Sequence, residues 1–396
     1  MSNFFAQVAA ITSMNLRNLP ERKASTIVAL VGIVGVVAVL VGVLAIREGF
    51  REVLDLSGSE DVAIVLRGGA TDEMSSSMLQ DQTRIIADAP GVARDSAGPL
   101  ASPELYVVVD VPIRKTNTPA NVPLRGVSPQ GPKLREAFKI VAGRTFTPGT
   151  FEMIVGRGAA LQFAGLEVGH RIRWGSTEWA IVGIFEDDGS VAESEVWTDA
   201  SVLQGAYRRG TTFQSTRVKL TSPQALSTFK DALTADPRVN VRIYSERQFY
   251  EQQSRPLVTT VNIVGNFIAL LMGIGAVFGA LNTMYSAVSA RTREIATLRA
   301  IGFSAGPVVI SVLVEAMVIG VLGGVLGGII GWLGFDGIRT ATLNPATFSQ
   351  ITFAFNVTPA LLVQGLVYAL ILGFVGGLLP SLRAARLPIT TGLREM

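Results

Sequence analysis

The sequence predicts an α-helical membrane protein with four transmembrane (TM) helices and a large α+β extracytoplasmic domain between TM1 and TM2. Three observations support this fold class. Of the 396 residues, 48% are hydrophobic, and the mean hydropathy of +0.41 is high for a soluble chain. The hydrophobic residues are concentrated in four long blocks that are almost free of charge. The segment between the first two blocks has instead the composition of an ordinary globular domain.

The composition argues against several classes of site. The chain has no cysteine and a single histidine, His170, which disfavours a disulfide framework, a zinc site and a histidine-based triad. The net charge of +3 does not indicate a nucleic-acid partner, because the cations cluster beside the apolar blocks, where membrane topology accounts for them. No Walker A phosphate-binding loop occurs in the sequence, so we expect no cofactor site in this chain.

Two segments precede the inserted domain. Residues 1–22 have apolar side chains at mixed three- and four-residue spacing, which predicts an amphipathic cytoplasmic helix lying on the membrane and ending at Pro20; a frayed terminus is the alternative. Residues 24–48 form TM1, since no charge occurs from Ala24 to Ile46. A cleaved signal peptide would have a shorter apolar core and a small-residue cleavage site, so we set this alternative aside.

Residues 49–250 form the extracytoplasmic domain. A strand–helix–strand pattern occurs near both of its ends, so the segments 58–111 and 213–248 are expected to share one α/β lobe. One helix of this lobe is expected at residues 76–89. The stretch between the two segments, 112–212, is rich in strand and hairpin patterns. We therefore predict a β-rich lobe inserted into an α/β lobe.

The rest of the chain returns to the membrane. Residues 251–290 combine a stalk with TM2, because the uncharged stretch from Pro256 to Ala290 makes a helix of roughly 50 Å, longer than the ~30 Å hydrocarbon core. The segments after it are a cytoplasmic hinge (291–302), TM3 (304–335), a short outer loop (336–357), TM4 (358–380, ended by Pro380) and a cytoplasmic tail (381–396).

The short segments that flank the apolar blocks indicate the orientation. Three of them carry several cations each: Arg17, Arg22 and Lys23; Arg291, Arg293 and Arg299; Arg383, Arg386 and Arg394. The 336–357 segment has only Arg339. By the positive-inside rule, both termini and the hinge are cytoplasmic and the inserted domain is outside.

TM3 has two features that bear on function. It contains two interleaved series of glycines four residues apart: Gly320, Gly323, Gly324, Gly327, Gly328 and Gly331. Such spacing favours a tight helix interface within or between subunits, although glycine is generally frequent in membrane helices. Glu315 lies two to three turns into TM3, where a carboxylate is costly. It either bonds a neighbouring helix or belongs to a proton or substrate path.

The hinge has an amphipathic pattern. Ile295, Leu298 and Ile301 are apolar at three-residue spacing, and four charged residues surround them: Arg291, Arg293, Glu294 and Arg299. A short helix of this kind could lie in a groove of a soluble partner. Alternatively, its basic residues only set the topology. The spacing alone does not decide between the two.

These motifs together resemble a known family. The hinge sequence RTREIATLRAIGF from Arg291, followed by Glu315-Ala and the glycine series, is similar to the core of FtsX/MacB/LolC-type (type VII) ABC transporter permeases. The PSLRAARLP motif from Pro380, the NLPERK motif before TM1 and the order of segments are similar too, whereas the outer domain is similar in plan only. The resemblance implies a coupling helix that docks on a separate ATPase through Arg291, Thr292, Arg293, Glu294, Ile295, Leu298, Arg299, Ile301 and Gly302.

The resemblance also implies a function. The chain would be a non-catalytic permease of the bacterial inner membrane, a homodimer in contact with membrane lipid, with ATP and Mg²⁺ bound by the partner ATPase. Mechanotransmission would export or extract a hydrophobic or amphiphilic substrate, and a periplasmic adaptor and outer-membrane channel are optional partners. Because the N-terminus before TM1 is short, we expect no fused N-terminal ATPase domain. The alternatives are an FtsX-like signalling permease that activates an extracellular cell-wall hydrolase, and a membrane-anchored enzyme, which the lack of a nucleophile–base set disfavours.

Overall fold

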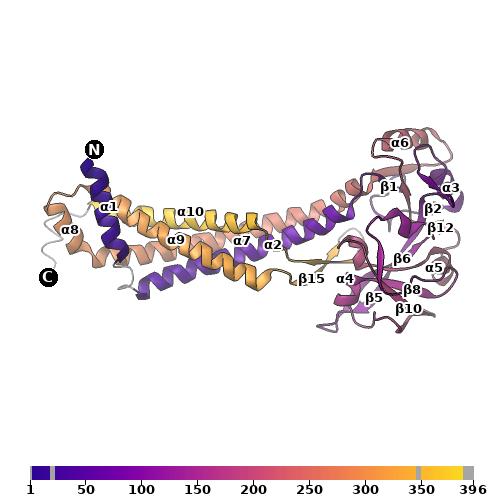
Figure 1. The fold of residues 1–396 in the computed structure, drawn as a ribbon, viewed down its shortest axis with the longest axis horizontal. Coiled ribbons are helices and arrows are strands. Elements are labelled where there is room, and N and C mark those ends of the chain that lie inside the picture. The colour runs from indigo at the N-terminus through magenta and orange to yellow at the C-terminus, as the bar shows by residue number, and fades with distance from the viewer. Residues whose placement is uncertain (1, 18–22, 345–348, 387–396) are drawn as a thin grey trace. The chain divides into compact units, whose positions relative to one another are not determined.

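The computed structural model describes residues 2–17, 23–344 and 349–386, and the chain divides into two compact units (Figure 1). Unit 1 contains residues 1–48, 260–338 and 355–396, and unit 2 contains residues 49–259 and 339–354.

Unit 1 is helical. Its elements, two of which also contribute to unit 2, are α1 (Ser2–Arg17), α2 (Lys23–Ser57), α7 (Glu246–Ala290), α8 (Thr292–Ala300), α9 (Ala305–Phe335) and α10 (Pro359–Arg386). Four of them, α2, α7, α9 and α10, contain a stretch long and apolar enough to cross a membrane. Because backbone polar groups in lipid must bond within their own segment, charge-free stretches of this length form helices. The predicted fold class is confirmed.

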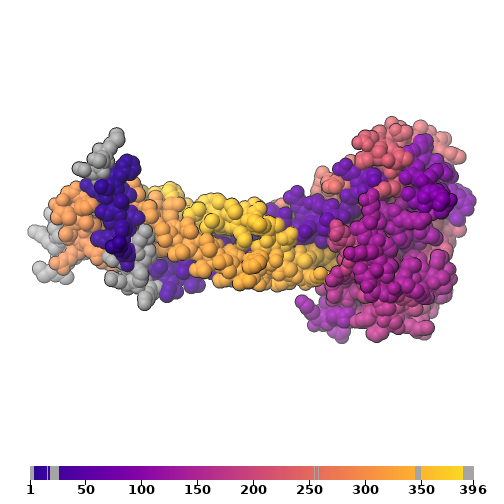
Figure 2. Space-filling model, in the orientation of Figure 1, coloured from indigo at the N-terminus to yellow at the C-terminus, as the bar shows by residue number. Residues whose placement is uncertain are grey.

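Helix α9 is the centre of unit 1. Figure 2 shows the orange α9 beside the yellow α10, with the indigo α1 lying across α9. One buried cluster joins Ile33 and Val37 of α2 to Ile319 of α9 and Ala369 of α10. A second cluster joins Ile11 of α1 to α7, α8, α9 and α10. Helix α1 ends at Arg17, and the rest of the predicted 1–22 helix, up to residue 22, lies outside the described residues.

Helix α10 contradicts the prediction that Pro380 ends TM4. The helix passes through Pro380 and ends at Arg386. An interior proline costs a backbone hydrogen bond. However, Pro380 is buried, and Ala384 beyond it is fully enclosed in the cluster that contains Ile11. Packing of the last helical turns therefore outweighs the local preference of proline. Of the predicted tail 381–396, residues 387–396 lie outside the described residues.

Unit 2 is built on a 10-stranded sheet with the order β14-β1-β13-β5-β6-β11-β8-β10-β7, in which β9 pairs with β10. Neighbouring strands are antiparallel except for the parallel pairs β6–β11 and β8–β10. Its strands are β1 (Val62–Arg67), β5 (Ala101–Pro112), β6 (Pro119–Val127), β7 (Lys139–Gly143), β8 (Glu152–Gly156), β9 (Arg171–Trp174), β10 (Thr177–Glu186), β11 (Val196–Asp199), β13 (Ser215–Lys219) and β14 (Val241–Ser245).

The sheet serves a small hydrophobic core around Phe185 and Trp197 and two larger ones. One of the larger cores, around Phe229 and Ile243, belongs to the α/β segments, and the other, around Trp179, belongs to the inserted β-rich segment. Strand β5 contributes to both, with Ala101 in the first core and Leu105 in the second. The two predicted lobes therefore share a strand, and the β-rich core begins within residues assigned by sequence to the α/β lobe.

Shorter elements cover the sheet or lie beside it. They are α3 (Gln80–Ala87), α4 (Arg157–Gln162), α5 (Ala200–Ala206), α6 (Ala225–Ala235), two 3₁₀ turns (Gly131–Leu134 and Val191–Ser194) and the two-residue strands β2 (Met78–Leu79), β3 (Arg94–Asp95), β4 (Gly98–Pro99) and β12 (Thr212–Phe213). The helix predicted at 76–89 begins only at Gln80, because Met78 and Leu79 pair with β12.

The predicted outer loop at 336–357 contains a β-hairpin, β15 (Arg339–Asn344) and β16 (Ser349–Ala354). Residues Ile351 and Phe353 alternate with more exposed neighbours and are buried in unit 2. The Ser349 and Thr352 side chains bond Tyr106 (2.7 Å) and Ser194 (2.8 Å). The prediction of a loop without strands was wrong. The segment has few charges, and the two-residue alternation that predicts a strand extends over only a few residues here.

Candidate functional site

Helix α8 is a separate element between α7 and α9. At its start, Arg291 departs from helical geometry, with a φ of −107°. At its end, Gly302 has a φ of +107°, in the left-handed region that favours glycine. The chain therefore turns at both ends of α8, at the hinge that the sequence analysis singled out.

The inner face of α8 packs within unit 1. Ile295 and Ala296 are buried, and Ile295 joins the cluster that contains Ile11 of α1 and Met284 of α7. Leu298 is half-buried against the same cluster. Arg299 donates a hydrogen bond to the Ala385 carbonyl in α10, at 2.8 Å. These residues hold α8 to its own chain.

The outer face of α8 and the two residues that follow the helix are open. Arg293 and Glu294 are exposed, as is Gly302, and the Ile301 side chain is 69% exposed. Thr292 is half-buried and donates a hydrogen bond to the Ser289 carbonyl. The apolar trio of the hinge therefore does not form one docking face, because Ile295 and Leu298 point inward and only Ile301 points outward.

A buried ion pair joins the base of α8 to α9. The Arg291 guanidinium donates to both carboxylate oxygens of Glu315, with Nη1–Oε2 at 2.8 Å and Nη2–Oε1 at 3.2 Å. The two side chains are 4% and 5% exposed. Removal of one partner from such a pair leaves an uncompensated buried charge. This contact brings together a residue of the hinge and a residue of TM3, which lie 24 positions apart in the sequence.

The two glycine series of α9 face different helices. Gly320 and Gly324 approach α10, where an added Cβ would lie 2.9 Å from atoms of Ala369. Gly328 faces α10 less tightly. The other series faces α2, and a Cβ on Gly327 would lie 2.8 Å from the Val34 carbonyl oxygen. Gly323 and Gly331 have the same orientation toward α2. The glycines thus allow α9 to pack against two neighbours within one chain.

Helix α7 has an exposed apolar face. Its span is the least buried of the four, at 22%. Phe267, Leu270 and Phe278 are each at least 59% exposed. An added Cβ on Gly275 or Gly279 would meet no atom of the described residues within 4 Å. This face is therefore free for lipid or for a second helix.

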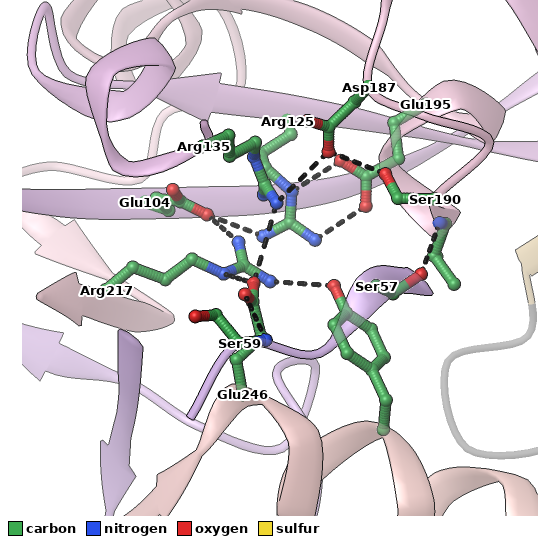
Figure 3. A network of polar contacts seen from close by, with 12 residues as sticks. Ser57, Ser59, Glu104, Arg125, Arg135, Asp187, Ser190, Glu195, Arg217 and Glu246 are labelled. Atoms are coloured by element: carbon green, nitrogen blue, oxygen red, sulfur yellow. Dashed lines mark hydrogen bonds and ion pairs between the residues drawn. The ribbon is translucent and has the colours of Figure 1, made fainter. Parts of the chain in front are cut away.

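Unit 2 contains a buried ionic network that sequence reasoning missed (Figure 3). At its centre, Arg125 of β6 bonds three carboxylates: Glu73 (2.7 Å), Glu104 of β5 (2.8 Å) and Glu195 (2.7 Å). Arg217 of β13 also pairs with Glu104. These contacts tie together strands from both larger cores of the sheet.

The same network reaches the first two turns of α7. Arg217 lies 3.4 Å from Glu246 and 3.3 Å from the Tyr250 hydroxyl. Arg135 lies 3.5 Å from Glu246 and stacks over the Trp197 ring, 4.8 Å from its centroid. The network therefore holds the start of α7 to the sheet of unit 2.

Burial and the arginines act in opposite directions on the carboxyl pKa values. Burial disfavours the ionised form of Glu73, but Arg125 and Arg217 outweigh it and lower the pKa to about 2. Arg125 likewise lowers the pKa of Glu195 despite burial. For Glu246 burial prevails over Arg135 and Arg217, and its pKa is raised. Burial also raises the pKa of Tyr250 to about 12.

A sequence signal for this network existed. Arg125 and Arg217 lie inside short runs with strand character, where a charged residue needs a buried partner. The identity of the partners depends on pairing between distant strands, which the sequence alone does not provide. Within the described residues, no group of histidine and acidic side chains could hold a metal ion.

Four membrane-length helices with a large α/β domain between the first and second define a multi-pass membrane protein with an extracytoplasmic-type domain. The sequence matches two families: "MacB-like periplasmic core domain" over residues 26–236 and "FtsX-like permease C-terminal" over residues 266–389. The first match covers more than half of the chain. The chain belongs to the MacB/FtsX-like family of ABC transporter permeases.

Individual relatives are similar over nearly the whole chain. The "Macrolide export ATP-binding/permease protein MacB" of Bordetella avium is 22% identical over 98% of this chain and 59% of its own length. Its Escherichia coli namesake is 25% identical over 94% of this chain and 59% of its own length. The chain therefore spans about 59% of these relatives. The crystal structure of the periplasmic region of MacB from Actinobacillus actinomycetemcomitans matches 51% of this chain and 96% of its own, with 13% identity and a TM-score of 0.37.

Proposed function

We propose that this chain is the transmembrane subunit of an ABC transporter whose separate ATPase subunit drives export or extraction of a hydrophobic or amphiphilic substrate. Family membership supports the permease role, and the relatives' name joins permease to ATP-binding functions. The chain itself has no Walker A motif. ATP and Mg²⁺ would thus bind the partner, and this chain would be non-catalytic.

The observation that carries the coupling proposal is the two-sided character of α8. Its outer face presents Arg293, Glu294 and the 69%-exposed Ile301, which suit a groove on a soluble partner. Its base is held by the Arg291–Glu315 pair and by the buried Ile295. A push on the outer face would therefore move α7 and α9 rather than bend α8 alone.

Helix α7 would carry this movement outward. Its last residue, Ala290, adjoins Arg291, and its first turns are held by the ionic network through Glu246 and Tyr250. In such mechanotransmission the substrate need not cross the membrane through the permease. The match to a MacB-like periplasmic core domain favours this transport function over hydrolase activation by an FtsX-like signalling permease.

We further propose a homodimer in the bacterial inner membrane, with both termini and α8 in the cytoplasm. The exposed face of α7, with Gly275 and Gly279 open, suits a second copy of this chain or lipid. The cations flanking the spans support this orientation. A periplasmic adaptor and an outer-membrane channel would complete an export assembly.

The coupling proposal is tested by substitution of exposed residues of α8 and of the turn that follows it. The chain is purified from its native host with bound proteins, and Walker A proteins are identified by mass spectrometry. I301D and E294R should abolish co-purification of the ATPase and leave the unfolding temperature unchanged, because both side chains are exposed. T297A, on the same helix and also exposed, is the matched control. Undiminished ATPase recovery with I301D and E294R would contradict the coupling role.

A further inference from the structure

Unit 2 contains a groove that has no part in the proposed coupling between α8 and the ionic network. Its volume is about 580 Å³, within the range of small-molecule sites. Its walls are the last turns of α2, helix α4, the turn at residues 189–193 and the hairpin β15–β16. All of these residues belong to unit 2.

Part of the groove is apolar. Leu56 of α2 and Leu161 of α4 are 47% and 51% exposed. Phe353 of β16 lines the same groove and packs edge-to-face on Phe50, with ring centroids 5.6 Å apart. Exposed leucines along a concave surface favour a hydrocarbon chain as ligand.

The groove also presents two cations. Lys115 and Arg339 line it and are both exposed. Neither side chain has an ion pair or hydrogen bond with any other residue that the structure describes, whereas the neighbouring Arg114 pairs with Glu167 at 2.8 Å. Of the two carboxylates in the walls, Glu193 accepts hydrogen bonds from the Asp187 and Gly189 amides, and Glu52 has an interaction partner of its own. Lys115 and Arg339 are therefore the charged side chains of the lining that have no partner among the described residues.

Two walls of this groove follow membrane-length apolar stretches closely along the chain. Gly49, in one wall, follows the charge-free stretch of α2 after only two charged residues, Arg47 and Glu48. Arg339, in another wall, follows the last residue of α9, Phe335, after three residues. A charge-free helix of about 20 residues spans the hydrocarbon core. Both walls therefore begin within four residues of the end of a charge-free stretch of membrane-spanning length.

We propose that this groove binds an anionic amphiphile, with Lys115 and Arg339 on the anionic head group and Leu56 and Leu161 along the hydrocarbon chain. The ligand could be an outer-leaflet phospholipid or an exported molecule of the same chemistry. In the second case the inference names the substrate class and rests on the proposed function; in the first it stands alone.

The test uses the full chain in nanodiscs of phosphatidylcholine, without ATPase. The probe is phosphatidylglycerol with a photoactivatable acyl chain, and the neutral phosphatidylcholine analogue is the comparison. We expect preferential capture of phosphatidylglycerol on peptides that contain Leu161 or residues 352–354. The double variant K115Q/R339Q should reduce capture roughly thirtyfold, since each cation contributes to binding of an anionic head group. R173Q, which removes an exposed cation outside the groove, should capture normally.

Further measurements distinguish a resident lipid from an exported amphiphile, and failure of this inference from failure of the coupling proposal. Addition of the partner ATPase and ATP should release the probe if the amphiphile is exported, and should leave it bound if it is a resident lipid. L161S should lower capture while retaining the preference for the anionic head group. Equal capture of both analogues, or normal capture by K115Q/R339Q, would overturn the inference. Because the capture step contains no ATPase, this failure would leave the coupling proposal intact.

Discussion

Both units contain a buried arginine paired with carboxylate, but the number of carboxylate partners differs between them. In unit 1 the buried Arg291 has one carboxylate partner among the described residues, Glu315. In unit 2, Arg125 has three, and Arg217 shares one of them. Loss of a carboxylate therefore leaves Arg125 with two partners but leaves Arg291 with none. Unit 2 should therefore tolerate the loss of one carboxylate partner of Arg125, whereas the hinge depends on the single Arg291–Glu315 pair.

The largest effect is expected from removal of the centre of the network. R125M would leave Glu73, Glu104 and Glu195 buried without their shared cation, at a cost of about 4 kcal/mol or more. Denaturant unfolding of the detergent-solubilised chain, followed by tryptophan fluorescence, measures this loss. The matched control R144M removes an exposed arginine from Glu152 and should change stability little. Equal losses for R125M and R144M would refute the central role of Arg125.

The single pair of unit 1 is expected to be nearly as sensitive. E315Q leaves Arg291 buried and uncompensated, and should cost roughly 3 kcal/mol in the free energy of unfolding. The double variant R291M/E315L should recover most of this loss, because no buried charge remains. Thermal unfolding of the three proteins in one detergent gives the comparison. If the double variant is no more stable than E315Q, the uncompensated buried charge is not the cause of the loss.

Helix packing in unit 1 offers a comparison between adjacent glycines. G327A places a Cβ 2.8 Å from the Val34 carbonyl oxygen, whereas G328A places one 3.4 Å from the end of the Leu362 side chain. Backbone oxygen cannot yield, so G327A should cost about 1–2 kcal/mol and G328A almost nothing. The melting temperatures of the two variants test this difference. Equal melting temperatures would show that the α2 interface is not tight at Gly327.

The smallest expected effect is a pH dependence in unit 2. Burial raises the pKa of Glu246 in the folded state above its ordinary value of 4.5. Its favourable contribution is therefore complete below pH 4.5 and is lost as the pH rises through the folded pKa. E246Q should lose less stability than the parent chain as the pH rises above 4.5.

Unfolding free energies measured across that window check the prediction for Glu246, with the exposed Glu136→Gln variant as control. The contribution of Glu73 to stability depends on pH in the opposite direction. Its pKa is lowered to about 2, so its contribution is present at neutral pH and is lost as the pH falls below 4.5 toward 2. Parallel pH profiles for E246Q and the parent chain would contradict the assignment of Glu246.

Sequence reasoning succeeded where local pattern determines structure. Charge-free stretches identify the four membrane helices, and the strand–helix–strand patterns identify the two parts of the α/β lobe. It failed where distant residues decide: burial of Ala384 carries α10 through Pro380, and pairing with β12 delays the start of α3. The glycine spacing predicted an interface for α9, but which helix each series faces depends on the packing of α2 and α10.

In the candidate site, too, the sequence marks individual residues, but only the fold shows which of them pair. The sequence marked Arg291 and Glu315 individually, since each is a charge at or within a span. Their pairing requires α7 and α9 to lie together, so it could not be derived from spacing. The ionic network around Arg125 joins residues from Glu73 to Tyr250, and only the strand order brings them to one place.

The account depends on α8 and the sheet of unit 2 lying on opposite sides of one membrane, so that a cytoplasmic ATPase acts on a domain outside. The chain has no cysteine, so single cysteines at Ile301 and Arg173, both exposed, can be labelled with a membrane-impermeant maleimide in sealed vesicles. The account predicts labelling of I301C only in inside-out vesicles and of R173C only in right-side-out vesicles. Labelling of both positions from the same side would contradict it.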